Sequence, residues 1–142
     1  MVDQERLVSS FCELVRIDSP SGQEEEVSRH LEERLRNLGF RVERDAYRNV
    51  IASEDGENPL LLSAHMDTVE PGRGINPQVR GDRIESDGAT ILGGDCKAGV
   101  AALMEALESC ALEGRARRPV QVVFTREEEI GLIGASNLDY SM

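Results

Sequence analysis

The sequence lacks any apolar run long enough to cross a membrane, and it lacks a secretion signal. A spanning helix needs about 20 consecutive apolar residues, and polar residues interrupt every apolar stretch here well before that length. The amino terminus has neither the basic start nor the apolar stretch of a signal peptide. We therefore expect a cytoplasmic protein that does not bind membranes.

Basic residues are also scarce, since 16 lysines and arginines stand against 27 aspartates and glutamates, a formal net charge of −11. Nucleic acids and anionic lipid surfaces are bound by clustered positive charge, so this balance disfavours both kinds of partner. Excess carboxylate is compatible with a divalent metal ion, although most surface carboxylates only interact with water.

Cysteines are few, odd in number and without a C-x-x-C pair, which argues against a disulfide framework or a zinc knuckle. Cys12 and Cys110 fall on helical patterns and are expected to be small core residues. Cys96 lies beside Asp95 in a turn, and a nucleophilic role would need a histidine base that the sequence does not reveal.

The 142 residues have the length of one domain, and their pattern predicts helices alternating with strands. Apolar side chains recur at helical spacing in residues 3–16, 21–38 and 100–111. Strand patterns occupy residues 40–44, 49–53, 60–64 and 120–125, and a hairpin is expected at 79–85. Residues 60–64 and 120–125 are apolar on both faces, as in strands buried inside a sheet. The predicted fold is α/β: a three-layer sandwich with a central mixed, largely parallel sheet flanked by helices.

Two details concern the second predicted helix. Ser21 followed by Glu24 has the spacing of a capping box, which would begin that helix. His30 lies off the apolar stripe, so we expect a solvated side chain and not a metal ligand.

Three groups of potential metal ligands follow predicted strands. His65 and Asp67 end the run at 60–64, Glu128 and Glu129 follow the run at 120–125, and Asp95 stands in a glycine-rich turn before the third helix. Nitrogen and carboxylate donors of this kind suit zinc, and also cobalt or manganese. His65 and Asp67 can face the same way because strand side chains alternate, so Asp67 can hold the imidazole in one tautomer. One glutamate of the pair can bind metal while the other takes a proton from water.

These segments resemble the di-zinc family of aminopeptidases, carboxypeptidases and deacylases that includes peptidase T. The resemblance is carried by residues 63–69, 86–99 and 128–135, and the amino-acid sequence of the turn before Asp95 is most similar to the peptidase T branch. It implies that His65 and Glu129 are zinc ligands, that Asp95 bridges two zinc ions and that Asp67 supports His65. It also implies that Glu128 is the general base and that the peptide bond after Asp95 is cis.

The resemblance also concerns the length of the chain. In the family, two further metal ligands and a lid domain that binds substrate and mediates dimers lie beyond the stretch that matches here. We therefore expect residues 1–142 to be the N-terminal portion of a metallopeptidase catalytic domain, with the lid domain and the C-terminal catalytic segment absent and with an incomplete site.

Three functions stay open from the sequence. The first is removal of the N-terminal residue from short peptides by a homo-oligomeric, peptidase T-like enzyme. The second is deacylation of N-acyl amino acids, or carboxypeptidase activity, by another member of the same family. The third is a noncatalytic module that binds metal or self-associates.

Overall fold

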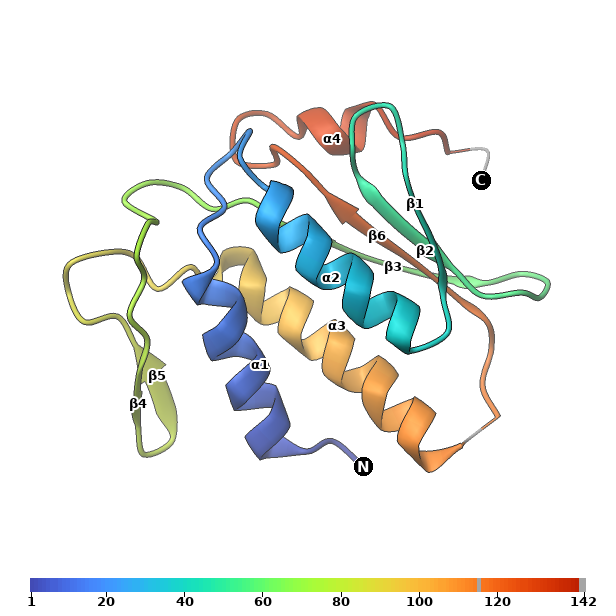
Figure 1. Ribbon diagram of the computed structural model, residues 1–142, viewed down its shortest axis with the longest axis horizontal. Coiled ribbons are helices and arrows are strands. Elements are labelled where there is room, and N and C mark those ends of the chain that lie inside the picture. Colours follow the sequence, from blue (N-terminus) through green and yellow to red (C-terminus); the bar gives the residue numbers. More distant parts are fainter. Residues whose placement is uncertain (115, 141–142) are drawn as a thin grey trace.

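A four-stranded sheet covered by helices forms the centre of the computed structural model, which describes residues 1–114 and 116–140 (Figure 1). The sheet order is β1-β2-β6-β3, formed by Arg41–Arg44, Val50–Ser53, Val120–Thr125 and Leu60–His65. β1 pairs with β2 and β2 with β6 in antiparallel fashion, whereas β6 and β3 run parallel. The predicted α/β fold with a mixed sheet is confirmed, and its parallel pairing is confined, in the described residues, to β3 and β6.

Three long helices pack on the sheet: α1 (Gln4–Arg16), α2 (Glu25–Asn37) and α3 (Gly94–Glu113). α2 contacts β1 and β2, α3 contacts β3, and α1 lies along α3. All three are on one side of the sheet (Figure 1), so the described residues supply two of the three layers of the expected sandwich. The core between these layers includes Leu14, Leu31, Met104 and Phe124, which are fully buried.

The two strands predicted to be buried have different environments. β6 lies inside the sheet, and five of its six residues are buried. β3 forms the edge of the described sheet, and Leu60 and Leu61 are 46% and 54% exposed. The prediction of burial on both faces is therefore wrong for residues 60–64, because in the described residues the long helices cover only one face of the sheet and β3 has a neighbouring strand along one edge only.

One smaller feature was predicted, one was not, and two expectations about the second helix are wrong. Strands β4 (Gln78–Arg80) and β5 (Arg83–Glu85) form the predicted hairpin, and a short helix, α4 (Ile133–Ser136), follows the glutamates. The predicted capping box does not form, because α2 begins after Glu24 without a side-chain cap. His30 is half-buried, not solvated, and burial lowers its pKa.

No helix in residues 1–114 or 116–140 combines the length and apolar character that a membrane span requires.

Candidate metal centre

The topology of the sheet brings the predicted ligands to one rim, the end of the sheet at which β3 and β6 finish. β3 and β6 are parallel neighbours, and His65 pairs in register with Thr125 at their carboxyl ends. The chain leaving β6 continues directly into Glu128 and Glu129, so these glutamates emerge beside His65. Ligand sites in open α/β sheets lie beyond the carboxyl ends of the strands, and this rim has that position.

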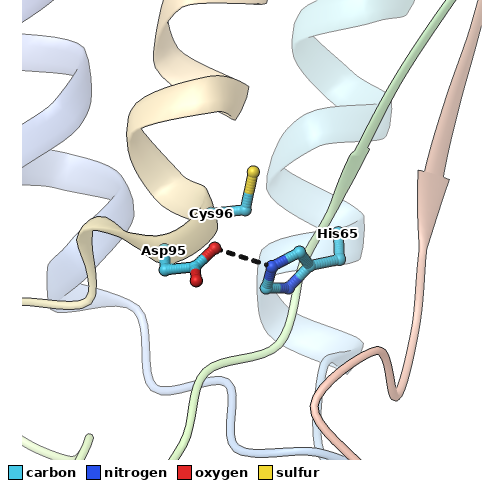
Figure 2. Close-up of side chains that lie close together, drawn as sticks. All are labelled: His65, Asp95 and Cys96. Atoms are coloured by element: carbon cyan, nitrogen blue, oxygen red, sulfur yellow. Dashed lines mark hydrogen bonds and ion pairs between the residues drawn. The ribbon is translucent and has the colours of Figure 1, made fainter. Parts of the chain in front are cut away.

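Both nitrogens of the His65 imidazole face carboxylates. Its Nε2 lies 3.1 Å from Asp95 Oδ1 and 3.9 Å from Glu128 Oε2, and the contact with Asp95 is drawn in Figure 2. Its Nδ1 lies 3.0 Å from the backbone carbonyl oxygen of Asp67 and 3.4 Å from the carboxylate oxygen Oδ1 of the same residue. A carbonyl oxygen only accepts hydrogen bonds, so Nδ1 carries a proton and Nε2 is the atom that can bind a metal ion.

The protonation of His65 reflects the same surroundings. Burial works to lower its pKa, but hydrogen bonds to Asp67 and Asp95, together with the charges of Asp67 and Glu128, raise the pKa to about 9. Without a metal ion the imidazole is therefore a cation at neutral pH, and it donates Nε2–H to Asp95.

Asp67 is a fully buried carboxylate that organises the rim. It accepts hydrogen bonds from Ser21 Oγ at 2.6 Å and from the backbone N–H groups of Glu128 and Glu129 at 3.0 and 3.1 Å. Burial works to raise the pKa of Asp67, and these donors together with His65 hold it well below its usual range. One carboxylate thus fixes both the imidazole and the loop that carries the glutamates.

Asp95 projects from a break in the helical backbone at the start of α3. Gly93 before it has a φ of 74°, a left-handed conformation that favours glycine. Asp95 and Cys96 have non-helical backbone angles, and the peptide bond between them is cis, as the family resemblance implies. The Asp95 side chain is 87% exposed, so it lies at the open side of the rim.

Two overlapping groups of donors fit a divalent metal ion. His65 with Asp95 and Cys96 forms one, and His65 with Glu128 and Glu129 forms the other; within each, the ligand atoms lie within 4.8 Å of one another. Nitrogen, oxygen and sulfur donors in this number match the preferences of zinc and its neighbours in the first transition series. The structure thus places all five predicted site residues at one rim, with Asp67 beneath the others.

Several supporting residues were not identified from the sequence. Glu24 is fully buried and accepts hydrogen bonds from the N–H of Glu127 and the guanidinium of Arg126. It therefore holds the start of the glutamate loop, the segment after Arg126 that carries Glu128 and Glu129. Ser21 bonds Asp67, as described above. Cys96 lies near His65, which the sequence could not reveal. The one signal available was Ser21 followed by Glu24, which was assigned to helix capping.

Comparison with known proteins agrees with this geometry. Residues 49–140 match the model of Peptidase family M28. The chain belongs to peptidase family M28. The resemblance of the sequence to peptidases of the peptidase T kind is thereby confirmed at the level of the family.

Known structures resemble this member of peptidase family M28 over nearly its whole length. A tripeptidase from Staphylococcus aureus is 37% identical with a TM-score of 0.94, a match that covers 99% of this chain and 41% of the tripeptidase. Aminopeptidase PepT from Bacillus cereus is 37% identical with a TM-score of 0.91, over 97% of this chain and 40% of PepT. The uncharacterised protein YqjE of Bacillus subtilis is 37% identical over 100% of this chain and 41% of its own length. The chain spans about two fifths of each of these relatives.

Proposed function

We propose that this chain is the N-terminal portion of the catalytic domain of a metal-dependent aminopeptidase that removes the first residue of short peptides. The observation that supports the proposal most directly is the convergence of His65, Asp95 and the two glutamates at one rim. Similarity to a tripeptidase and to aminopeptidase PepT supports the substrate class. A lid domain and further metal ligands outside residues 1–142 are part of the proposal, and so is a cytoplasmic location.

We assign the residues of the rim as follows. His65, through Nε2, and Glu129 would be metal ligands, and Asp95 would be a ligand shared between two metal ions. Zinc suits the donors best, with cobalt or manganese as substitutes. Divalent ions in such sites act as Lewis acids toward a peptide carbonyl and lower the pKa of water.

Glu128 is the general base in this proposal. Its side chain is 34% exposed and lies 3.9 Å from His65 Nε2, so it can face both the ligand set and solvent. Its backbone is held by Asp67, which limits how far the carboxylate can move from the rim. Glu128 would take a proton from the attacking water and return it to the leaving amine, the double role of a base in peptide hydrolysis.

The test measures the hydrolysis of three substrates, a tripeptide, an N-acetylated tripeptide and an N-acyl amino acid, with added Zn²⁺, Co²⁺ or Mn²⁺. One protein is the chain itself, and the other is a chimera that joins residues 1–142 to the remaining portion of the Staphylococcus aureus tripeptidase. We expect the chimera to release the first residue of a tripeptide and to leave an N-acetylated tripeptide intact. The chain alone is expected to be much less active, because metal affinity falls with the number of ligands.

Each alternative has its own signature in this assay. Cleavage of an N-acyl amino acid in preference to the tripeptide would favour a deacylase, and release of the last residue would favour a carboxypeptidase. A chimera that binds zinc but hydrolyses none of the three substrates would contradict the proposal and favour a noncatalytic module. Equal activity of the chain and the chimera would contradict the expectation that residues 1–142 contain only part of the site.

A further inference from the structure

Lys97 is the only lysine in the sequence, and its side chain is almost completely buried, at 1% exposure. Its Nζ donates a hydrogen bond to Ser19 Oγ at 2.6 Å and a longer one to the backbone carbonyl of Leu14 at 3.5 Å. Among residues 1–114 and 116–140, none of the ion pairs of the structure involves Lys97. The one ammonium side chain of this protein is therefore held inside it by neutral oxygen atoms.

Stability does not explain this arrangement. Transferring an ammonium group from water to a protein interior is unfavourable, and an apolar side chain of similar length is often equally or more stable in such a place. Arginine, which supplies the other basic side chains of this chain, would bring a planar group with five donors into a niche that offers two acceptors. A lysine at position 97 thus suggests a role in the rim nearby.

Ser19 connects Lys97 to the segment that carries Asp67. While its Oγ accepts from Lys97, the same hydroxyl donates to the backbone carbonyl of Met66 at 3.0 Å. The backbone carbonyl of Ser19 accepts from the N–H of Thr68, also at 3.0 Å. Ser19 therefore holds the residues on both sides of Asp67, and the ammonium of Lys97 fixes the direction of the serine hydroxyl.

Lys97 is also attached to the other side of the candidate centre. It follows Asp95 by two residues in the first turn of α3, so its backbone belongs to the turn that presents the bridging carboxylate. Burial lowers the pKa of Lys97 to about 8, and the charges of Asp67, Asp18 and Glu24 oppose that effect. The ammonium thus stands between the Asp95 turn and the segment that ends β3.

We propose that Lys97 is a positioning residue. Through Ser19 it fixes residues Met66–Thr68 relative to the Asp95 turn, so that His65 and Asp95 face each other across one metal position. The metal part of this inference rests on the proposed function. The contact between Lys97, Ser19 and the Met66–Thr68 segment does not, because it is formed by the chain itself.

The first measurement needs no metal. Amide hydrogen exchange of Thr68 reports the hydrogen bond to Ser19, and we expect it to be about tenfold faster in Lys97→Met than in the wild-type chain. Ser19→Ala is the second variant, and Ser109→Ala is its matched control, because Ser109 is also a buried serine with a hydrogen-bonded hydroxyl but lies far along α3. Exchange at Thr68 is expected to stay at the wild-type rate in Ser109→Ala.

The second measurement is the affinity for Co²⁺, followed by the visible absorption of the bound ion. Residues that orient metal ligands typically change metal affinity by about 10- to 100-fold, and we expect a loss of that size in Lys97→Met and Ser19→Ala. The affinity of the double variant for Co²⁺ should fall no further than that of the weaker single variant, because both residues act through the same hydrogen bond between Lys97 and Ser19. Lys97→Met should unfold at the wild-type temperature or above. If Lys97 served only to stabilise the fold, the variant would unfold at a lower temperature.

The outcomes separate the two proposals. Wild-type exchange at Thr68 together with wild-type cobalt affinity in Lys97→Met would overturn the positioning role. A fall in the thermal midpoint of Lys97→Met with unchanged cobalt affinity would overturn it as well. If the wild-type chain and the chimera bind no cobalt, the metallopeptidase function fails, whereas exchange at Thr68 still decides whether Lys97 fixes the segment.

Discussion

At the scale of single residues, Glu128 and Glu127 are neighbours with different surroundings. Glu128 faces His65, whereas the carboxylate of Glu127 lies 3.7 Å from the guanidinium of Arg126. If Glu128 is the general base, Glu128→Gln should lower kcat of the chimera by about 10²- to 10⁴-fold while zinc binding stays at the wild-type level. The measurement is steady-state hydrolysis of a tripeptide together with zinc content.

Glu127→Gln is the control for this prediction, because it removes the same charge one residue earlier. We expect its kcat to stay within about threefold of the wild-type value, a difference of under 1 kcal/mol. Retained turnover in Glu128→Gln would remove Glu128 from the base role.

Asp67 gives a second prediction at this scale, concerning stability. Its ionised carboxylate accepts from Ser21, from the N–H groups of Glu128 and Glu129 and from His65. In Asp67→Asn the NH₂ group cannot accept these bonds, and hydrogen bonds to charged groups contribute more than neutral ones. We therefore expect the free energy of unfolding to fall by about 3 kcal/mol. Urea unfolding of the chain measures the change.

Asp82→Asn is the matched control, since the Asp82 side chain is 92% exposed in the β4–β5 turn. Its effect should stay within about 0.5 kcal/mol. Similar values for the two variants would mean that the buried contacts of Asp67 do not stabilise the fold.

At the scale of secondary-structure elements, ion pairs of Arg6 with Glu105 and Glu108 join α1 to α3. Arg6 donates from Nε and a terminal nitrogen to the two carboxylate oxygens of Glu105, at 2.6 and 2.7 Å. The hydrogen bond from Arg6 is the largest influence on the pKa of Glu105 and exceeds the opposing effect of burial, so the pKa falls from the ordinary 4.5 to about 2.

The sign of the pH dependence follows from this shift. A carboxylate with a lowered pKa stabilises the folded chain fully above its unfolded value of 4.5, and that contribution is lost as pH falls toward about 2. Glu105→Gln should therefore unfold at a lower temperature than the wild type at pH 7, and the gap should narrow between pH 4.5 and 2. Thermal scans across this range test it, with the exposed Glu5→Gln on α1 as control. A gap that does not change with pH would contradict the assignment.

Gly134 in α4 gives a prediction about how the glutamate loop closes. A Cβ at this position would lie 2.5 and 2.8 Å from the backbone oxygen and nitrogen of Arg126, so the backbone itself would have to move. Overpacking of this kind costs about 1–3 kcal/mol, and we expect that loss in Gly134→Ala, measured by urea unfolding. The loop that carries Glu128 begins at Arg126, so cobalt affinity should fall as well.

Gly94→Ala is the control, because a Cβ there would meet nothing within 4 Å. Its unfolding free energy should change by less than about 0.5 kcal/mol. A loss in Gly134→Ala as small as that expected for Gly94→Ala would show that the crowding at Gly134 is relieved without cost.

At the scale of the whole molecule, the exposed edge of β3 bears on association. Leu60 and Leu61 are about half exposed on a strand that pairs, in the described residues, with β6 alone. Unpaired strand edges with apolar side chains favour pairing with another chain. We therefore predict that the chain forms oligomers at micromolar concentration and that Leu61→Lys shifts it toward the monomer. Light scattering after size-exclusion chromatography measures the mass.

Leu112→Lys is the matched control, since Leu112 is 74% exposed near the end of α3, away from the strand edge. It should leave the mass unchanged. Equal masses for the wild type and Leu61→Lys would count against association through β3.

The sequence alone predicts most of the sheet and the meeting of the ligands, but not the surroundings of several side chains. Apolar runs located the strands, and because parallel strands end at one rim, the meeting of His65 with the glutamates followed from their order. The position of β3 at the edge did not follow, because an apolar run looks the same at the centre and at the edge of a sheet. Ser21 and Glu24 were misassigned because a local capping pattern does not reveal distant partners: Ser21 donates to Asp67, and Glu24 accepts from Arg126 and Glu127. The burial of Lys97 was equally hidden, since lysine is a surface residue in most proteins.

Because the only lysine of the sequence is buried, cleavage after it can measure how often the chain unfolds around α3. A protease that cuts only after lysine has one cleavage point in these 142 residues, and the folded chain shields it. Digestion should therefore yield two fragments at a rate that follows the population of molecules with α3 detached. Loading the rim with zinc should slow that cleavage, so a simple gel would follow ligand binding without any label.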